Sequence, residues 1–513
     1  MSVGRRKNAF KGMAWGIVNK IILTIMPFLI RTIIIYKLGA EYVGLSSLFT
    51  AILELLNLAE AGLSSAIVFC MYEPMAQGDR SKINAYLMYY KKCYQIIGCI
   101  VAGVGLLFLP FLSKLISGSY PDDINIYLLY LIYVGNCLLN YFMCIYKSSV
   151  LIADQRTDIV SNISTIVILI QYAVQAICLI VFKNYYIYII IMPMCTAINN
   201  ILVSHEVKRR YSDLNPVGEL QKKEIDQLFN CVKGMVIAKI SATAIFSCDT
   251  FVVSAFLGLK ALAKYNNYYM IFAALGSIIT AMSAAIVPSI GNCIATQSVE
   301  YNRNNFKIFN FVYCWMIDWM SITFLCLCQN FMFLWVGKDL VLNFAIPVLF
   351  AFLFLCSRSF DVVCMYHDAL GYWYKNRFIK IAAAVVNITL DIMMVKICGM
   401  LGVIISTIIS EMLIMLPGYV YVLFKEYFKE NMILYMIKQM GRITIAILVG
   451  VITYYVCEKV GGTTLQSLIV RTVICVVVPN VLMILIYGRS KEYKNAKQFV
   501  LDCIKSIGIK RGI

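Results

Sequence analysis

Charged residues are scarce in this chain of 513 residues: they make up 14% of it, against 61% hydrophobic residues. Soluble globular proteins carry close to twice that share of charge, so the composition excludes a soluble protein. The patterns Gly-x-Ser-x-Gly, His-Glu-x-x-His and the phosphate-binding Walker loop are also missing. The chain therefore lacks the common signatures of hydrolases, metalloproteases and nucleotide-driven enzymes, and we expect no catalytic residues and no enzyme activity.

The 19 cysteines lack the spacing of a metal or disulfide framework. No loop carries a pair of Cys-x-x-Cys motifs, and most cysteines fall inside apolar runs, as Cys99, Cys326 and Cys475 do. Cysteine in such a run behaves as a small hydrophobic residue. The sequence thus predicts inert buried thiols, no bound metal and no cofactor.

Long apolar runs dominate what is present, and the mean hydropathy is +0.79. Runs of about 20 residues recur along nearly the whole chain, and each is long enough to cross a bilayer as a helix. The alternating pattern of a membrane β-barrel is missing. We therefore predict an all-α integral membrane protein with about 14 transmembrane helices.

The net charge of +18 raises the question of a nucleic-acid partner. The distribution of the charge argues against such a partner, because most of the 45 lysines and arginines fall in segments on one side of the predicted spans. Such a bias sets membrane orientation by the positive-inside rule. The charge therefore predicts cytoplasmic N- and C-termini and no nucleic-acid partner.

An internal repeat organises the chain. Residues 30–44 align without a gap to residues 249–263, so that Leu-Gly at 38–39 meets Leu-Gly at 257–258. The register continues to Ala-Ile-Val at 66–68 and again at 285–287. Both copies start on the inside, so the duplication is parallel, a common plan for transporters. We predict two six-helix lobes related by a pseudo-twofold axis, followed by two C-terminal helices.

The repeat and the long charged connection at its middle set the predicted domain limits. They are an N-terminal lobe at 1–206, a cytoplasmic connection at 207–230, a C-terminal lobe at 231–428, helices 13 and 14 at 429–488, and a basic cytoplasmic tail at 489–513. We expect short amphipathic surface helices within the connection and the tail.

Charges deep inside apolar spans mark candidate functional sites, because each costs about 2.5–3.5 kcal/mol at a helix centre. Arg31 lies in the outer half of span one, and Asp249 lies one residue from the repeat-equivalent position. Both are candidates for substrate binding, or they pair and fasten the two halves together. Lys20 returns to nearly the same helix face as Arg31, so it either binds substrate or extends to the inner headgroups.

Further charges at depth are candidates for ion coupling or charge balance. Glu54 and Glu60 lie near the middle of span two, and Asp391 lies on a polar stripe of span eleven. Arg358 and Asp361 are three residues apart in span ten. Arg358 is a candidate substrate-binding residue and Asp361 a coupling residue, or the two form a self-contained ion pair.

Two motifs resemble a known family. The first is Arg31 followed by Leu-Gly-x3-Val-Gly-Leu at 38–45, and the second is Asn387-x3-Asp391 followed by Gly-x2-Gly-x3-Ser-Thr at 399–407. With the span count and the duplication, they make the chain similar to the polysaccharide transporters, the Wzx-type lipid-linked oligosaccharide flippases. These belong to the multidrug/oligosaccharidyl-lipid/polysaccharide exporter (MOP) superfamily.

The resemblance implies a function. Members flip polyprenyl-pyrophosphate-linked oligosaccharide, such as an undecaprenyl-pyrophosphate-linked unit, from the inner to the outer leaflet for O-antigen, capsule or exopolysaccharide. It implies alternating access, a monomer among membrane lipids, and contact with the polysaccharide polymerase machinery. Arg31 is then expected to bind pyrophosphate or an acidic sugar, and spans thirteen and fourteen to accommodate the lipid tail.

A departure separates the chain from the drug exporters of the same superfamily. Those relatives use a cation-coupling acid in span one, whereas the buried charge of this span one is Arg31. The departure favours an anionic lipid substrate. A cation-coupled small-molecule or drug exporter of the same fold remains the alternative function.

Overall fold

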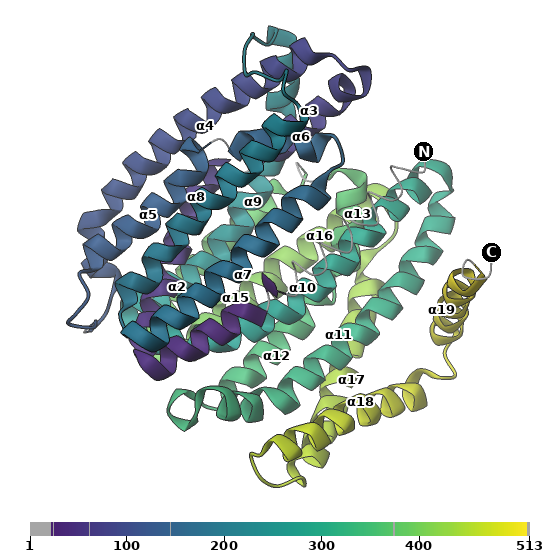
Figure 1. Ribbon diagram of the computed structural model, residues 1–513. Helices are drawn as coiled ribbons and strands as arrows, with labels where there is room; N and C mark the ends of the chain where they lie inside the picture. The colour runs from purple at the N-terminus through teal and green to yellow at the C-terminus, as the bar shows by residue number, and fades with distance from the viewer. Residues whose placement is uncertain are drawn as a thin grey trace. The chain divides into compact units, whose positions relative to one another are not determined.

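The structure is a computed structural model in which the described residues form helices and their connections, with no strand among them. The described residues are 22–23, 25–60, 62–118, 120–143, 145–372 and 375–509. Lys20 lies outside them, so its predicted role stays a prediction. The chain divides into two compact units, residues 1–263 and 264–513. Each unit is a bundle of helices (Figure 1).

The first unit begins with a helix over residues 25–37, which carries Arg31. Its further elements are α2 (Ala40–Leu56), η1 (Asn57–Glu60), α3 (Leu63–Gln77), α4 (Arg80–Phe108), η2 (Leu109–Leu115), α5 (Ile126–Phe142), η3 (Ile145–Lys147), α6 (Ser148–Ala153), α7 (Thr157–Phe182), α8 (Tyr185–Arg210) and α9 (Lys222–Leu257).

The second unit contains most of α10 (Leu259–Thr296) and all the elements that follow it in the chain. Its further elements are α11 (Val299–Val336), η4 (Lys338–Leu340), α12 (Ala345–Arg358), α13 (Asp361–Leu370), α14 (Arg377–Cys398), α15 (Met400–Ser410), η5 (Glu411–Met415), α16 (Leu416–Leu423), η6 (Phe424–Phe428), α17 (Met432–Glu458), α18 (Leu465–Tyr487) and α19 (Lys491–Ile509).

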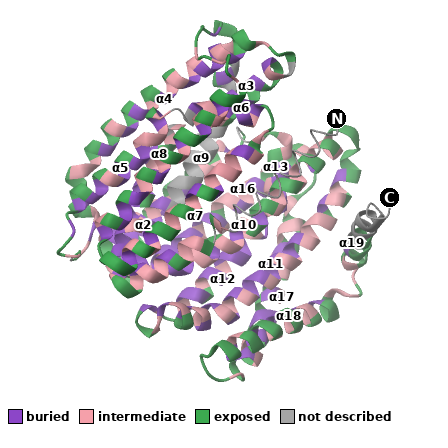
Figure 2. Ribbon diagram, viewed as in Figure 1, coloured by how far each residue is buried: buried purple, intermediate pink, exposed green. Residues whose placement is uncertain are grey.

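Ten helices among the described residues are long and apolar enough to cross a membrane. Figure 2 shows exposed residues along many of the helices, and many of them are large hydrophobic residues. On α7, Ile170, Ile177 and Val181 lie on one face with 54%, 59% and 63% of their surface exposed, while Gln175 is buried. Such a stripe is costly in water and suits lipid. The protein is a multi-pass helical membrane protein, and the count of 14 spans stays a prediction.

Three apolar runs, at 43–70, 124–152 and 341–366, contain interruptions in their helices that the sequence did not predict. Span two breaks after Leu56, where η1 follows and Gly62 takes a φ of 84°. Span four breaks between α5 and α6, and span ten breaks at residues 359–360 between α12 and α13. Periodicity cannot reveal such breaks, because the apolar runs continue through them.

The duplicated turn has the same backbone conformation in both copies. Gly39 precedes α2 with φ 124° and ψ 168°, and Gly258 precedes α10 with φ 85° and ψ 174°. A side chain is strained at such positive φ angles, which glycine adopts freely. A methyl group at Gly44 would overlap the carbonyl oxygen of Leu259, so α2 and the start of α10 pack backbone to backbone. The two turns thus share a glycine at positive φ, as the internal repeat predicts.

The charged segment before the second copy does not form a helix of its own, contrary to the prediction. It forms the first turns of α9, which runs without interruption from Lys222 to Leu257. Gln221 and Glu224 build a capping box at its start, which fixes that boundary. In the tail, α19 is the predicted helix, and Phe499 contacts Phe309 of α11 with ring centroids 5.4 Å apart.

Candidate functional site

Arg31 lies in the interior of the first unit. Its Nη2 atom donates a hydrogen bond to the carbonyl oxygen of Ala263 at 3.4 Å, and its charge is close to Tyr185 and Tyr188 of α8. Asp249 of α9 is buried in the same unit. The structure therefore gathers both halves of the repeat around this cation, whereas the pairing of Arg31 with Asp249 stays a prediction.

The two acids of predicted span two have different surroundings. Glu54 is exposed on α2. Glu60, at the break after α2, accepts a hydrogen bond from the hydroxyl of Tyr94, which in turn accepts one from Tyr90 at 2.8 Å. Glu60 is thus held by a chain of hydroxyl groups, and such a chain can pass a proton.

Arg358 and Asp361 lie on either side of the break between α12 and α13. Arg358 Nη1 is 3.8 Å from Asp361 Oδ2, so the sequence-based alternative of a self-contained pair agrees with the geometry. A Cβ atom at Gly276 would lie 2.8 Å from Arg358 Nη2, so the guanidinium packs directly on the backbone of α10. Glu411, in the π-helical turn η5, is buried with its charge close to this pair.

Asp391 fastens the hairpin of α14 and α15. It accepts a hydrogen bond from the hydroxyl of Ser406, and Asn387 donates one to Thr407 at 3.1 Å. A methyl group at Gly402 would overlap the carbonyl oxygen of Met394, so the two helices approach closely. The polar residues of the second family motif thus hold one hairpin together.

A second buried ion pair escaped the sequence analysis. Asp318 of α11 and Arg442 of α17 form a hydrogen-bonded salt bridge. Arg442 also donates to Ser359, in the break after α12, and to Gln439 at 2.9 Å. Neither Asp318 nor Arg442 is among the candidate residues predicted from the sequence. The signal was available, since Asp318 is a charge inside an apolar run.

Near this pair the second unit contains a cavity of about 500 Å³. Its walls come from α11, η6, α17 and α18 and are mainly apolar, with aromatic rings such as Trp315 and Phe428. Four basic residues and three acids also line it, namely Arg303, Lys307, Lys438, Arg442, Asp318, Glu430 and Glu492. Arg303 pairs with Glu430 and Arg442 with Asp318, whereas Lys307 and Lys438 form no ion pair within the described part of the chain. A cavity of this size with apolar walls and a few cations can hold an amphiphilic anion.

The comparisons with known proteins identify the family. Residues 9–293, more than half of the chain, match the family model described as "Polysaccharide biosynthesis protein". The chain belongs to this family. The search of curated proteins finds no match to this chain.

Solved structures agree on the fold. A lipid II flippase, MurJ, in an inward closed conformation matches with a TM-score of 0.64 at 14% identity, covering 93% of this chain and 98% of that chain. An inward-facing multidrug resistance MATE transporter of the MOP superfamily matches with 0.60 at 13% identity, covering 80% and 97%. A MATE transporter from Vibrio cholerae matches with 0.53 at 14% identity, covering 84% and 99%.

These matches establish that this polysaccharide biosynthesis family member has the MOP fold. The predicted fold class, an all-α membrane bundle like that of MurJ and the MATE transporters, is thereby confirmed. The structural neighbours are named as a flippase and as transporters, and at 13–14% identity they show a shared fold. The predicted substrate, partners and site residues are not tested by the matches.

Proposed function

We propose that this protein flips polyprenyl-pyrophosphate-linked oligosaccharide from the inner to the outer leaflet of a bacterial cytoplasmic membrane, with both termini cytoplasmic. One observation carries the proposal. The helices α17 and α18, which follow the duplicated lobes, help to build the cavity of about 500 Å³ with apolar walls and basic residues. A lipid with a prenyl tail and a diphosphate has the matching chemistry.

The apolar part of the cavity suits the tail. Trp315, Phe428 and Leu434 offer rings and branched carbons to an isoprenoid chain, and burying apolar surface stabilises such a complex by about 25 cal/mol per Å². The exposed ammonium groups of Lys307 and Lys438 suit the phosphates, since charge-assisted hydrogen bonds to phosphate are strong.

Arg31 is the proposed headgroup ligand of the first unit. A guanidinium offers paired donors that match phosphate oxygens bidentately. Its hydrogen bond to the Ala263 carbonyl is long, at 3.4 Å. Tyr185 and Tyr188 beside it offer rings on which a sugar can stack.

Two groups are candidates for coupling transport to protons. Asp361 and Glu411 are carboxylates that share the surroundings of Arg358, at the break between α12 and α13 and at the π-helical turn. Interrupted helices in membranes commonly form ion and substrate sites. Asp391 is a weaker candidate because it fastens a hairpin, and Glu54 is a weaker one because it is exposed.

Lipid analysis of a strain without this gene tests the proposal. We expect a pyrophosphate-linked oligosaccharide to accumulate on the cytoplasmic leaflet while surface polysaccharide disappears. The wild-type gene and the control Lys37→Ala, an exposed cation on the helix of Arg31, should both restore export, whereas Arg31→Ala should not. Persistent surface polysaccharide without a lipid intermediate contradicts the flippase and favours the cation-coupled exporter, which drug-driven proton movement in liposomes then tests.

A further inference from the structure

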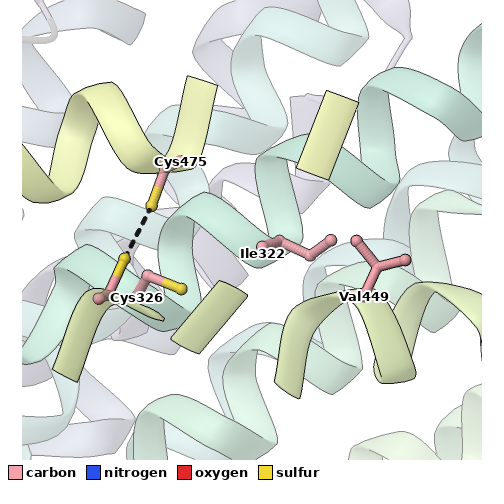
Figure 3. Packing of buried hydrophobic residues seen from close by; sticks show 5 residues of the cluster. Ile322, Cys326, Val449 and Cys475 are labelled. Carbon is pink, nitrogen blue, oxygen red and sulfur yellow. Dashed lines mark hydrogen bonds between the residues drawn. The ribbon is translucent and has the colours of Figure 1, made fainter. Parts of the chain in front are cut away.

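Three buried cysteines meet in the second unit. Cys326 of α11, Cys457 of α17 and Cys475 of α18 have all their sulfur atoms within 4.8 Å of one another. Their side chains are 2%, 0% and 0% exposed. In Figure 3, a dashed line from the sulfur of Cys475 marks its contact with the sulfur of Cys457, and Cys326 lies beside them. The sequence predicts inert thiols here, and only the packing of three helices brings them together.

The spacing of the sulfurs fits one metal ion. Sulfur ligands lie about 2.3 Å from a bound soft metal, so three of them in a trigonal plane lie about 4 Å apart. The sulfurs of Cys457 and Cys475 are 3.8 Å apart, close to this value. The third sulfur is within 4.8 Å of both, so shifts of well under an ångström bring all three onto one ion.

The number and type of ligands select the ion. Among the described residues, the group holds three cysteines and no fourth histidine, cysteine, aspartate or glutamate. Structural zinc takes four ligands, whereas thiolates alone suit monovalent copper, which accepts low coordination. The surrounding residues Ile322 and Val449 are apolar, so they offer no water position beside the ion.

A buried cation lies beside the thiols. Arg471 stands one helical turn before Cys475 on α18, is 7% exposed, and donates to the carbonyl oxygen of Val460 at 2.8 Å. Thiolates bound to one Cu⁺ leave a net negative charge, which is costly in an apolar core. The guanidinium offsets part of that charge, and it also pairs with Glu458 of α17 at 3.5 Å.

We propose that Cys326, Cys457 and Cys475 bind one monovalent copper ion, which fastens α17 and α18 to α11. Each thiol releases its proton to solvent as its sulfur binds the ion. The ion thereby fixes the two C-terminal helices that line the cavity. This inference stands independently of the proposed transport function, since copper binding is measured without any transport substrate.

Copper titration of the purified full-length protein tests the site. The protein is reduced, kept without oxygen, and titrated with Cu⁺ against a chromogenic copper chelator. We expect one ion per chain and new near-ultraviolet absorption from copper–thiolate bonds. Cys326→Ala and Cys475→Ala should each lower the affinity by about 100-fold or more, since even outer-shell changes cost 10–100-fold. The control Cys328→Ala, another buried cysteine of α11, should leave the affinity unchanged.

A second measurement needs no variant. The wild-type protein is unfolded in the presence of a thiol-alkylating reagent, with and without one equivalent of Cu⁺, and its peptides are analysed by mass spectrometry. We expect slower labelling only at the three cysteines. Protection elsewhere, equal affinity for Zn²⁺, or a native disulfide between Cys457 and Cys475 overturns the proposal.

Discussion

The two units treat the charges of their apolar helices differently. In the first unit, Arg31 contacts a backbone carbonyl and lies near tyrosines, and Glu60 accepts from a tyrosine hydroxyl. In the second unit, Asp318 pairs with Arg442, and Asp361 pairs with Arg358. A charge held by neutral dipoles can receive a charged ligand at small cost, whereas an ion pair must first be broken. The two ion pairs of the second unit therefore favour a fixed architecture near its cavity, where the exposed Lys307 and Lys438 remain the proposed phosphate ligands.

The largest effect is expected from breaking the buried pair of the second unit. Asp318→Ala leaves Arg442 charged without its carboxylate partner, which should lower the free energy of unfolding by about 3–5 kcal/mol. Thermal unfolding in detergent measures the loss, with the exposed Asp339→Ala as control. An apolar double replacement, Asp318→Leu with Arg442→Met, should recover most of it. Equal stability of Asp318→Ala and the control contradicts the structural role.

A functional loss without a stability loss is expected in the first unit. Arg31→Ala removes a charge-assisted contact worth about 1.5–3 kcal/mol, so flipping of a labelled lipid-linked oligosaccharide in liposomes should fall about 10- to 100-fold. Unfolding should change by less than about 1 kcal/mol. Lys37→Ala should match wild type, and Arg31→Lys should keep part of the activity because the charge remains.

The same residue tests the alternative that the repeat halves are fastened by an ion pair. Under that alternative, Arg31→Asp and Asp249→Arg are each inactive, and the double variant regains activity. We expect the double variant to stay inactive, because the ligand-binding cation has moved. Recovery of activity in the double variant would indicate that Arg31 and Asp249 form an ion pair. The first unit would then hold its charges in ion pairs, as the second unit does.

Disrupting close helix packing should lower the free energy of unfolding by a similar amount in both units. Gly44→Ala in the first and Gly402→Ala in the second each force a methyl group against a backbone carbonyl, at Leu259 and Met394. Such overpacking costs about 1–3 kcal/mol, read from thermal unfolding. Gly103→Ala is the matched control: nothing lies within 4 Å of its added Cβ atom, so helix propensity should stabilise it slightly.

The smallest effect is expected at the surface. Arg80 and Asp213 in the first unit are 3.5 Å apart and both exposed, so Arg80→Ala should cost less than about 1 kcal/mol. In the second unit, the hydrogen bond from Lys375 to Glu426 raises the pKa of Lys375. That stabilisation is complete at neutral pH and falls as pH rises through the raised pKa. Unfolding temperatures across pH should therefore separate Lys375→Ala from wild type only below that pKa.

Much of the fold followed from local sequence. The length of the apolar runs predicted membrane helices, and the repeated Leu-Gly pair predicted a duplicated turn that the φ angles of Gly39 and Gly258 bear out. The spacing of Arg358 and Asp361 offered an ion pair, and the pair is present. These features depend on neighbours within a few residues, so the sequence displays them directly.

The helix breaks and the long-range partners of the charged residues could not be predicted from the local sequence. The break after α12 is bound by Arg442, which comes 83 residues after Ser359. The apolar run through residues 341–366 gives no sign of that partner. The hydroxyl chain at Glu60 likewise depends on Tyr94 of another helix.

The sequence by itself determined that this protein is a helical membrane protein with a duplicated plan, because hydropathy and the repeat are written along the chain. Only the tertiary structure decided which charges pair with each other and which contact neutral groups. It also decided that Cys326, Cys457 and Cys475 share one site. The physical reason is that charge pairing and metal coordination depend on distances of a few ångströms between helices, and those distances arise only when the helices pack.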